Sequence, residues 1–345
     1  MQDYPMMIFY CRLAFSLLLI ISSNIFAAEG GVVGVNYGRL GNNLPSPTAV
    51  VNLLKSRNID RVRLFSPDAD ALNALRGSGI KVVLGVPNDD LQKLGDSSFA
   101  KTWINNNIVP YRNNVQFRYL AVGNEVIPGG LAGNVPPAMQ NLNAALKAAG
   151  IGDIPVTTAI HSAVLGTSYP PSAGQFSNAA DSVMRSIVGF LVANKSPLLV
   201  NIYPYFAYTG NPRDIQLDYA LFTANRVVIT DGNNQYRNLF DAMVDSTYAA
   251  LEKVGGGNVE IVISESGWPS AQNGNIATIP NARTYINNLV SHVSGTSGTP
   301  RRPGKSIETY IFALFNENQK GGLATEQHFG LYYPDMTPVY PVNFP

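Results

Sequence analysis

Short runs of apolar, mostly β-branched residues recur along the chain, and segments with helical spacing lie between them. The runs show little of the apolar–polar alternation of a half-exposed sheet, so they are typical of strands covered on both faces. Eight runs are candidate strands, at residues 32–38, 61–66, 81–87, 117–125, 155–161, 197–206, 260–268 and 306–317. Strands joined through helical crossovers pair in parallel, so the pattern predicts a parallel sheet.

The intervening segments have the periodicity of amphipathic helices, as at residues 46–57 and 238–255. Spacings of three and four residues gather the apolar side chains of the second segment on one face. These side chains are Phe240, Met243, Val244, Tyr248 and Leu251. Such a face would pack against the sheet.

Eight strands with crossovers in one chain predict an α/β fold, a closed (β/α)8 TIM barrel. An open doubly wound sheet is the alternative, although no glycine-rich nucleotide loop opens the first helix. Residues 207–259 form the longest gap between strands, too long for a plain loop. We therefore expect a small insertion after strand 6, forming a wall of the binding groove.

The N-terminal segment differs from the rest of the chain. Arg12 precedes an apolar run from Leu13 to Ile21, and the small residues Ala27 and Ala28 follow. This order predicts a secretory signal peptide over residues 1–28. A membrane anchor is the alternative, but a spanning helix needs about 20 apolar residues. No linker divides the remainder, so we expect a single catalytic domain over residues 29–345.

Composition limits the classes of partner. The formal net charge is +1 and only 14% of the residues are charged, with no basic stripe. This balance argues against nucleic acid and against an anionic membrane surface, and it favours a neutral substrate. The only cysteine, Cys11, lies in the N-terminal segment, and the three histidines lack metal-ligand spacing. We expect no metal and no cofactor.

Acidic residues follow several of the predicted strands. Glu125 ends the fourth strand, Glu265 ends the seventh, and Glu317, Lys320 and Glu326 follow the eighth. Catalytic residues of a barrel come from these strand ends. A single acid there could equally be a structural salt-bridge partner. The fourth and seventh strands lie across part of the barrel mouth from each other, so two glutamates there can flank one glycosidic bond, one as proton donor and the other ionised.

Aromatic residues gather at the same strand ends. The expected substrate-binding aromatics are Tyr37, Phe65, Tyr203, Phe206, Trp268 and Phe315, with Tyr205 and Tyr208 nearby. Flat rings can stack on the C–H faces of sugars, while polar groups at the rim bind their hydroxyls. Several of these rings could instead fill the core.

These motifs carry a close family resemblance. "IVISESGWPSAQ" resembles the signature of glycoside hydrolase family 17, the plant endo-1,3-β-glucanases. The stretches "GVNYGRLGNNLPSP", "LAVGNEV", "VNIYPYFAY" and "TYIFALFNENQK" resemble other blocks of that family in the same order. The resemblance extends from about Val33 to Phe344, which is nearly the whole chain after the N-terminal segment.

The resemblance implies a role for each matching residue. Glu265 would be the nucleophile, Glu125 the general acid/base, and Asn124 the residue that holds the sugar 2-hydroxyl. Glu317, Lys320 and Glu326 would support the nucleophile, since Lys320 beside Glu265 favours the ionised carboxylate. Asn36 and Asn201, which lie in matching blocks, complete the expected substrate-binding set.

The resemblance also implies a secreted monomer that hydrolyses β-1,3-glucan with retention, in the cell wall rather than the vacuole and with a role in plant defence. Retention predicts carboxyl groups about 5 Å apart, whereas inversion needs about 6.5–9.5 Å. A mixed-linkage 1,3-1,4-β-glucanase would share the same catalytic residues. A glucan-binding protein without activity is a further alternative, which the intact Glu125, Glu265 and Lys320 argue against.

Overall fold

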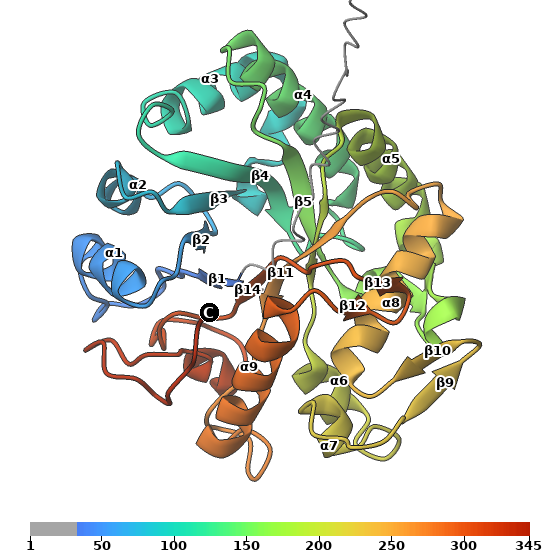
Figure 1. Cartoon of the computed structure of the whole chain (residues 1–345). Coiled ribbons are helices and arrows are strands. Elements are labelled where there is room, and N and C mark those ends of the chain that lie inside the picture. The colour runs from blue at the N-terminus through green and yellow to red at the C-terminus, as the bar shows by residue number, and fades with distance from the viewer. Residues whose placement is uncertain (1–32) are drawn as a thin grey trace, which may run out of the picture.

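A computed structural model describes residues 33–345, and eight of its strands close into a parallel barrel (Figure 1). The order around the barrel is β1-β14-β11-β8-β5-β4-β3-β2, and every neighbouring pair is parallel. The barrel strands are β1 (Val33–Asn36), β2 (Arg61–Leu64), β3 (Lys81–Val86), β4 (Gln116–Asn124), β5 (Val156–His161), β8 (Leu198–Asn201), β11 (Ile261–Ser266) and β14 (Thr309–Ile311). The predicted (β/α)8 barrel is therefore confirmed, and the open doubly wound sheet is wrong.

Helices surround the barrel and bury one apolar face each (Figure 1). They are α1 (Pro47–Ser56), α2 (Ala69–Leu75), α3 (Ser97–Asn107), α4 (Val135–Ala148), α5 (Asn178–Asn194), α8 (Leu239–Lys253) and α9 (Ile279–Ser294). Side chains of Ser46, Asp68, Asp96, Asn238 and Thr278 accept hydrogen bonds from free backbone N–H groups at five helix starts. Local sequence thus defines where these helices begin.

The predicted insertion is present between β8 and α8. It contains α6 (Pro204–Gly210), α7 (Leu217–Ala220) and the antiparallel hairpin β9 (Ile229–Asp231) and β10 (Asn234–Tyr236). Two further antiparallel strand pairs lie outside the barrel sheet. They are β6 (Leu165–Thr167) with β7 (Gln175–Phe176) and β12 (Gly298–Thr299) with β13 (Arg302–Pro303). Short 3₁₀ turns lie at Asn88–Asp90, Lys93–Gly95, Ala132–Asn134, Ser162–Val164, Pro171–Ala173 and Ala324–His328.

Apolar side chains from the barrel strands form a small cluster of their own, separate from the larger core beneath the helices. Its members are Val83, Tyr119, Ala121, Ala159, Leu199, Val262 and Tyr310. Arg63, Asn201 and Ser264 also lie on barrel strands and are buried, but they are polar. The barrel therefore carries a polar layer, and this layer belongs to the site described below.

Within residues 33–345, no helix is long and apolar enough to cross a membrane. The predicted signal peptide over residues 1–28 lies outside the described residues, so it stays a prediction.

Candidate active site

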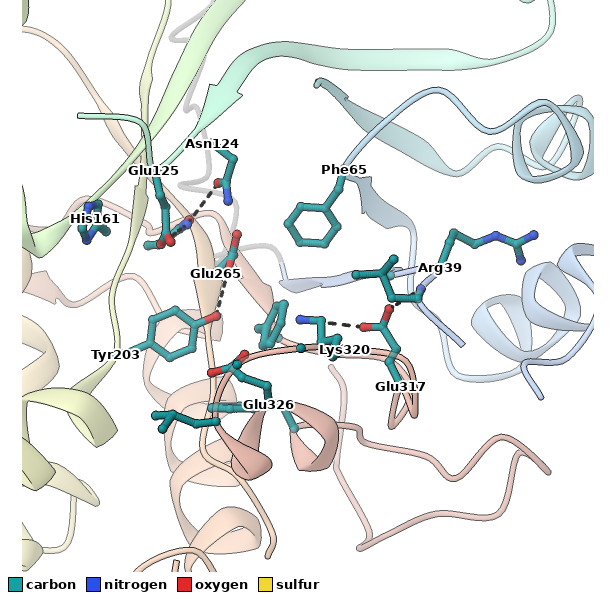
Figure 2. Close-up of a pocket in the computed structure, with 18 of the residues that line it drawn as sticks. Arg39, Phe65, Asn124, Glu125, His161, Tyr203, Glu265, Glu317, Lys320 and Glu326 are labelled. Carbon is teal, nitrogen blue, oxygen red and sulfur yellow. Dashed lines mark hydrogen bonds and ion pairs between the residues drawn. The ribbon is translucent and has the colours of Figure 1, made fainter. Parts of the chain in front are cut away.

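A cavity of about 870 Å³ opens at the carboxyl ends of the barrel strands (Figure 2). Its lining comes from the ends of β1, β2, β4, β5, β8 and β11 and from the segment after β14. The predicted residues that line it are Tyr37, Phe65, Asn124, Glu125, Asn201, Tyr203, Phe206, Glu265, Glu317, Lys320 and Glu326. The fold thus brings residues from distant parts of the chain to one site, as a TIM barrel does for catalysis.

Glu265 lies on β11 where the register with both neighbouring strands shifts. The irregularity re-aims a side chain that would otherwise follow the pleat. The carboxylate is only 5% exposed and has two partners. Arg63 Nη1 donates to Oε1 at 2.8 Å, and the Tyr203 hydroxyl donates to Oε2 at 2.7 Å. Both oxygens are therefore held in fixed positions at the cavity, and Figure 2 shows the contact with Tyr203.

Glu125 follows β4 with a left-handed backbone, at φ 56°. A residue other than glycine adopts this conformation at a cost of order 1–3 kcal/mol, so surrounding contacts must maintain it. Its backbone N–H donates to Ala159 O at 2.9 Å, which ties it to β5. Asn201 Nδ2 donates to Glu125 Oε1 at 2.8 Å, which orients the carboxyl group towards the cavity.

Arg63 is the central buried cation, and sequence analysis did not select it. Its guanidinium is 1% exposed and binds Glu265, the Ser264 carbonyl at 3.1 Å and Asn124 Oδ1 at 2.7 Å. The Phe65 ring lies 4.7 Å from the guanidinium carbon. The sequence does contain a signal for Arg63, because it is a charged residue inside the apolar run "RVRLFS" and a buried charge needs a partner.

Asn201 links the two carboxylates. Its amide nitrogen donates to Glu125 and to Asn124 Oδ1, while its oxygen accepts from Ser264 Oγ at 2.6 Å. Because Arg63 contacts Asn124, Asn201 and Glu265, one continuous polar network joins both glutamates. The two side chains thus face the same cavity from β4 and β11, which lie across part of the barrel mouth from each other, as the sequence predicted.

Burial and the neighbouring groups shift the pKa of Glu265 in opposite directions. Burial raises the pKa of Glu265, and the cations Arg63 and Lys320 with the Tyr203 hydroxyl act in the other direction. Burial, together with the negative charge of Glu265, raises the pKa of Tyr203 well above its usual value. Tyr203 is therefore a neutral donor that stabilises the ionised form of Glu265.

Lys320 and its two acidic neighbours occupy the side of the cavity after β14. Lys320 Nζ lies 3.9 Å from Glu317 Oε2 and 3.9 Å from the Phe312 ring centre. Glu317 also accepts from the Leu40 backbone N–H at 2.7 Å, and Gly38 leaves room for it, since a Cβ there would overlap the carboxylate. Burial raises the pKa of Glu317 and of Glu326, while Lys320 lowers both.

Three expected substrate-binding residues do not line the cavity. Asn36 and Trp268 are fully buried and Phe315 is 2% exposed. Trp268 Nε1 donates to Ile276 O at 2.8 Å, and its ring packs against Tyr205 and Tyr285. Because neighbouring side chains cover these three residues, the prediction that they contact substrate directly is corrected. They instead support the residues that line the cavity.

Other residues line the cavity that the sequence did not single out. They include His161 at the end of β5 and Ser162 after it, Arg39 and Leu40 after β1, and Phe312, Leu323 and Phe329 in the C-terminal segment. Among residues 33–345, no group of three or more metal-ligating side chains of the His, Cys, Asp and Glu types is present.

A closed barrel with two glutamates at its mouth, joined by a polar network in an open cavity, defines a glycoside hydrolase. Comparison with known proteins gives the particular family. The family model described as "Glycosyl hydrolases family 17" matches residues 33–344. The chain belongs to this family.

Similar proteins cover almost the whole chain. A "Glucan endo-1,3-beta-glucosidase" of Vitis vinifera is 57% identical over 318 residues, covering 90% of this chain and 91% of that protein. One similar solved chain comes from a study of two plant beta-glucan endohydrolases with distinct substrate specificities. It is 50% identical to this chain with a TM-score of 0.86, and the match covers 90% of this chain and all of that one. CJP38, a beta-1,3-glucanase and allergen of Cryptomeria japonica pollen, has 49% identity and a TM-score of 0.88, covering 91% and 99%.

Proposed function

We propose that this protein is a retaining endo-hydrolase of β-1,3-glucan in which Glu265 is the nucleophile and Glu125 the general acid/base. The single observation that carries this proposal is the network joining both carboxylates through Arg63 and Asn201. The named activity of the grapevine relative supports the β-1,3 linkage.

In the first step, Glu265 attacks the anomeric carbon and forms a glycosyl ester. The bond from that carbon to the leaving sugar breaks, and Glu125 gives its proton to the departing oxygen. In the second step, ionised Glu125 takes a proton from water, and the resulting hydroxide displaces Glu265. We assign the binding of the sugar 2-hydroxyl to Asn124, and the hydrogen bond that Arg63 Nη2 donates to Asn124 Oδ1 at 2.7 Å supports this role by fixing the side chain. Phe65, Tyr203 and Phe206 supply apolar surface for the sugar rings.

The supporting group has a defined task in this reaction. Lys320 keeps positive charge beside the cavity that contains Glu265 and Glu326. Glu317, fixed by the Leu40 N–H, orients Lys320. Their joint effect is to offset the burial that would otherwise neutralise the nucleophile.

Replacing Glu265 with Gln tests the assignment. The variant should lose nearly all reducing-sugar release from laminarin while it keeps its thermal unfolding midpoint. Glu260→Gln is the matched control, since Glu260 directly precedes the same strand and is exposed. Near-normal turnover by Glu265→Gln would rule out Glu265 as the nucleophile.

The same assay on a mixed-linkage 1,3-1,4-β-glucan distinguishes the alternative specificity. We expect faster release of reducing sugar from linear β-1,3-glucan than from the mixed-linkage polymer. Cleavage at internal bonds should shorten the β-1,3-glucan early in the reaction. We further propose export to the cell wall through the segment 1–28 and a role in plant defence. N-terminal sequencing of the protein recovered from wall extracts tests the export, and loss of the protein from those extracts after deletion of residues 1–28 would support it.

A further inference from the structure

His161 lies at the end of β5 and lines the active-site cavity. Successive side chains of a strand point to opposite faces of its sheet. On β5, Ala159 belongs to the apolar cluster inside the barrel, and Ile160 belongs to the core beneath the helices. His161 therefore projects to the same side as Ala159, at the barrel mouth. This side chain has no task in the proposed reaction.

Backbone contacts place His161 next to the residues that hold Glu125. The Glu125 N–H donates to the carbonyl of Ala159, two residues before His161, at 2.9 Å. His161 is also the register partner of Asn201 on β8, and Asn201 Nδ2 donates to Glu125 Oε1 at 2.8 Å. Figure 2 shows Glu125 between His161 and Glu265. His161 thus lies on the side of Glu125 that faces away from Glu265.

This order indicates on which side of the cleaved bond His161 lies. In a retaining hydrolysis the nucleophile meets the anomeric carbon, and the general acid meets the oxygen of the leaving sugar. The direction from Glu265 to Glu125 therefore follows the breaking bond from carbon to oxygen, and the leaving sugar lies beyond Glu125. His161 lines this part of the cavity.

The His161 ring is available to a ligand. The residue is partly buried, and its ring nitrogens have no hydrogen-bond or ion-pair partner among residues 33–345. His292, by comparison, pairs with Asp241 through Nε2 at 2.8 Å. A neutral imidazole offers one donor and one acceptor, which match the hydroxyl groups of an uncharged sugar. Because His161 forms no ion pair with Glu125, a contact with substrate fits its position better than a part in proton transfer.

Two neighbours of His161 complete a surface suited to a sugar. Ser162 is exposed and lines the same cavity. Phe206 on α6 is 38% exposed and also lines it, with its ring centre 5.2 Å from that of Tyr203. Because β8, which precedes α6, is the neighbour of β5 in the barrel, these groups lie on one side of the cavity. An aromatic ring suits the C–H face of a sugar, and polar side chains suit its hydroxyls.

We propose that His161 binds the sugar that leaves in the first step, through hydrogen bonds between its ring nitrogens and hydroxyl groups of that sugar. This inference rests on the proposed retaining hydrolysis. The contact forms only when the glucan continues past the cleaved bond, as it does at an internal bond of a polymer. His161 is therefore a specificity-determining residue for the leaving side.

Two substrates with different leaving groups test the inference on the full protein. Laminaripentaose places a sugar on the leaving side, whereas 2,4-dinitrophenyl β-laminaribioside releases dinitrophenolate and places none there. His161→Ala should lower kcat/KM on laminaripentaose roughly 3- to 10-fold, because a hydrogen bond to the sugar is lost. The same variant should stay within about twofold of wild type on the dinitrophenyl substrate. His161→Gln keeps a donor and an acceptor and should recover part of the loss.

Thr167→Ala is the matched control, since Thr167 is exposed in the same segment after β5 and does not line the active-site cavity. It should behave like wild type on both substrates. Equal losses on both substrates in His161→Ala would overturn the inference, because they indicate an effect on Glu125 or on the fold. Unchanged laminaripentaose hydrolysis in His161→Ala would overturn the inference alone. A wild type that hydrolyses neither substrate would overturn the proposed function together with this inference.

Discussion

At the residue scale, Arg63 connects the two glutamates proposed for catalysis. It is almost fully buried and contacts Glu265 directly and Glu125 through Asn124 and Asn201. Breaking such a pair leaves a buried carboxylate without its cation, which is more costly than losing an exposed salt bridge. Arg63 is thus a positioning residue whose removal should affect the ionisation of Glu265.

Substitution of Arg63 tests this role through the pH profile. Arg63→Gln should lower kcat on laminarin roughly 10²-fold. Loss of the cation also raises the pKa of Glu265 further, so the acid limb of kcat/KM should move to higher pH. Arg63→Lys keeps a positive charge and should recover part of the rate. Arg118→Lys, at the half-exposed pair with Glu308, is the control and should leave the profile unchanged.

Most of the site residues could be predicted from the sequence because they end apolar strands, where a barrel places its chemistry. Glu125 and Glu265 were found in this way. Arg63 was not predicted, because its partner, Glu265, lies 202 positions later in the chain and sequence spacing does not reveal that contact. Trp268 and Phe315 were assigned to the groove because an aromatic ring near a strand end has the same sequence signal whether it faces a ligand or the core.

At the scale of elements, the segment after β11 supports the strand end that carries Glu265. Trp268 packs edge-to-face with Tyr205 at 5.2 Å between ring centres and lies 5.6 Å from the ring centre of Tyr285. Tyr285 on α9 and Ser266 share a hydrogen bond at 2.6 Å. These contacts join α6, β11 and α9, so they fix where β11 ends and where Glu265 lies.

Trp268→Ala should therefore lower stability more than binding. A large buried aromatic replaced by alanine costs about 3–5 kcal/mol of unfolding free energy. Chemical denaturation measures this loss, and KM for laminari-oligosaccharides should change less than about twofold at a temperature where the variant is folded. An unchanged denaturation midpoint with a strongly raised KM would instead show that Trp268 contacts substrate.

At the scale of the whole molecule, Asp245 connects the insertion to the C-terminal third of the chain. It lies on α8 and accepts from the Tyr236 hydroxyl of β10 and from the Arg301 backbone N–H, each at 2.9 Å. The Thr299 hydroxyl of β12 donates to the other oxygen. Burial outweighs these donors and raises the pKa of Asp245 to about 6 from 3.8. The folded state thus holds this proton more tightly than the unfolded chain.

The sign of the pH effect follows from linkage. Between pH 4 and pH 6 the folded protein binds more protons at Asp245, so stability falls as the pH rises through this window. The free energy of unfolding falls by about 2–3 kcal/mol across this window because of Asp245. Asp245→Asn should remove that slope, which urea denaturation at several pH values would reveal as a difference from wild type. Equal slopes in both proteins would contradict the prediction.

In the proposed reaction, Glu265 attacks the sugar while Glu125 transfers the proton. An activated 2-deoxy-2-fluoro glycoside of a β-1,3-linked glucose disaccharide slows hydrolysis of the covalent intermediate, so peptide mapping by mass spectrometry can locate the attached sugar. We expect the label on the carboxyl of Glu265, in the peptide containing "ISESGWPS". A label on Glu125, or on any other residue, would contradict it.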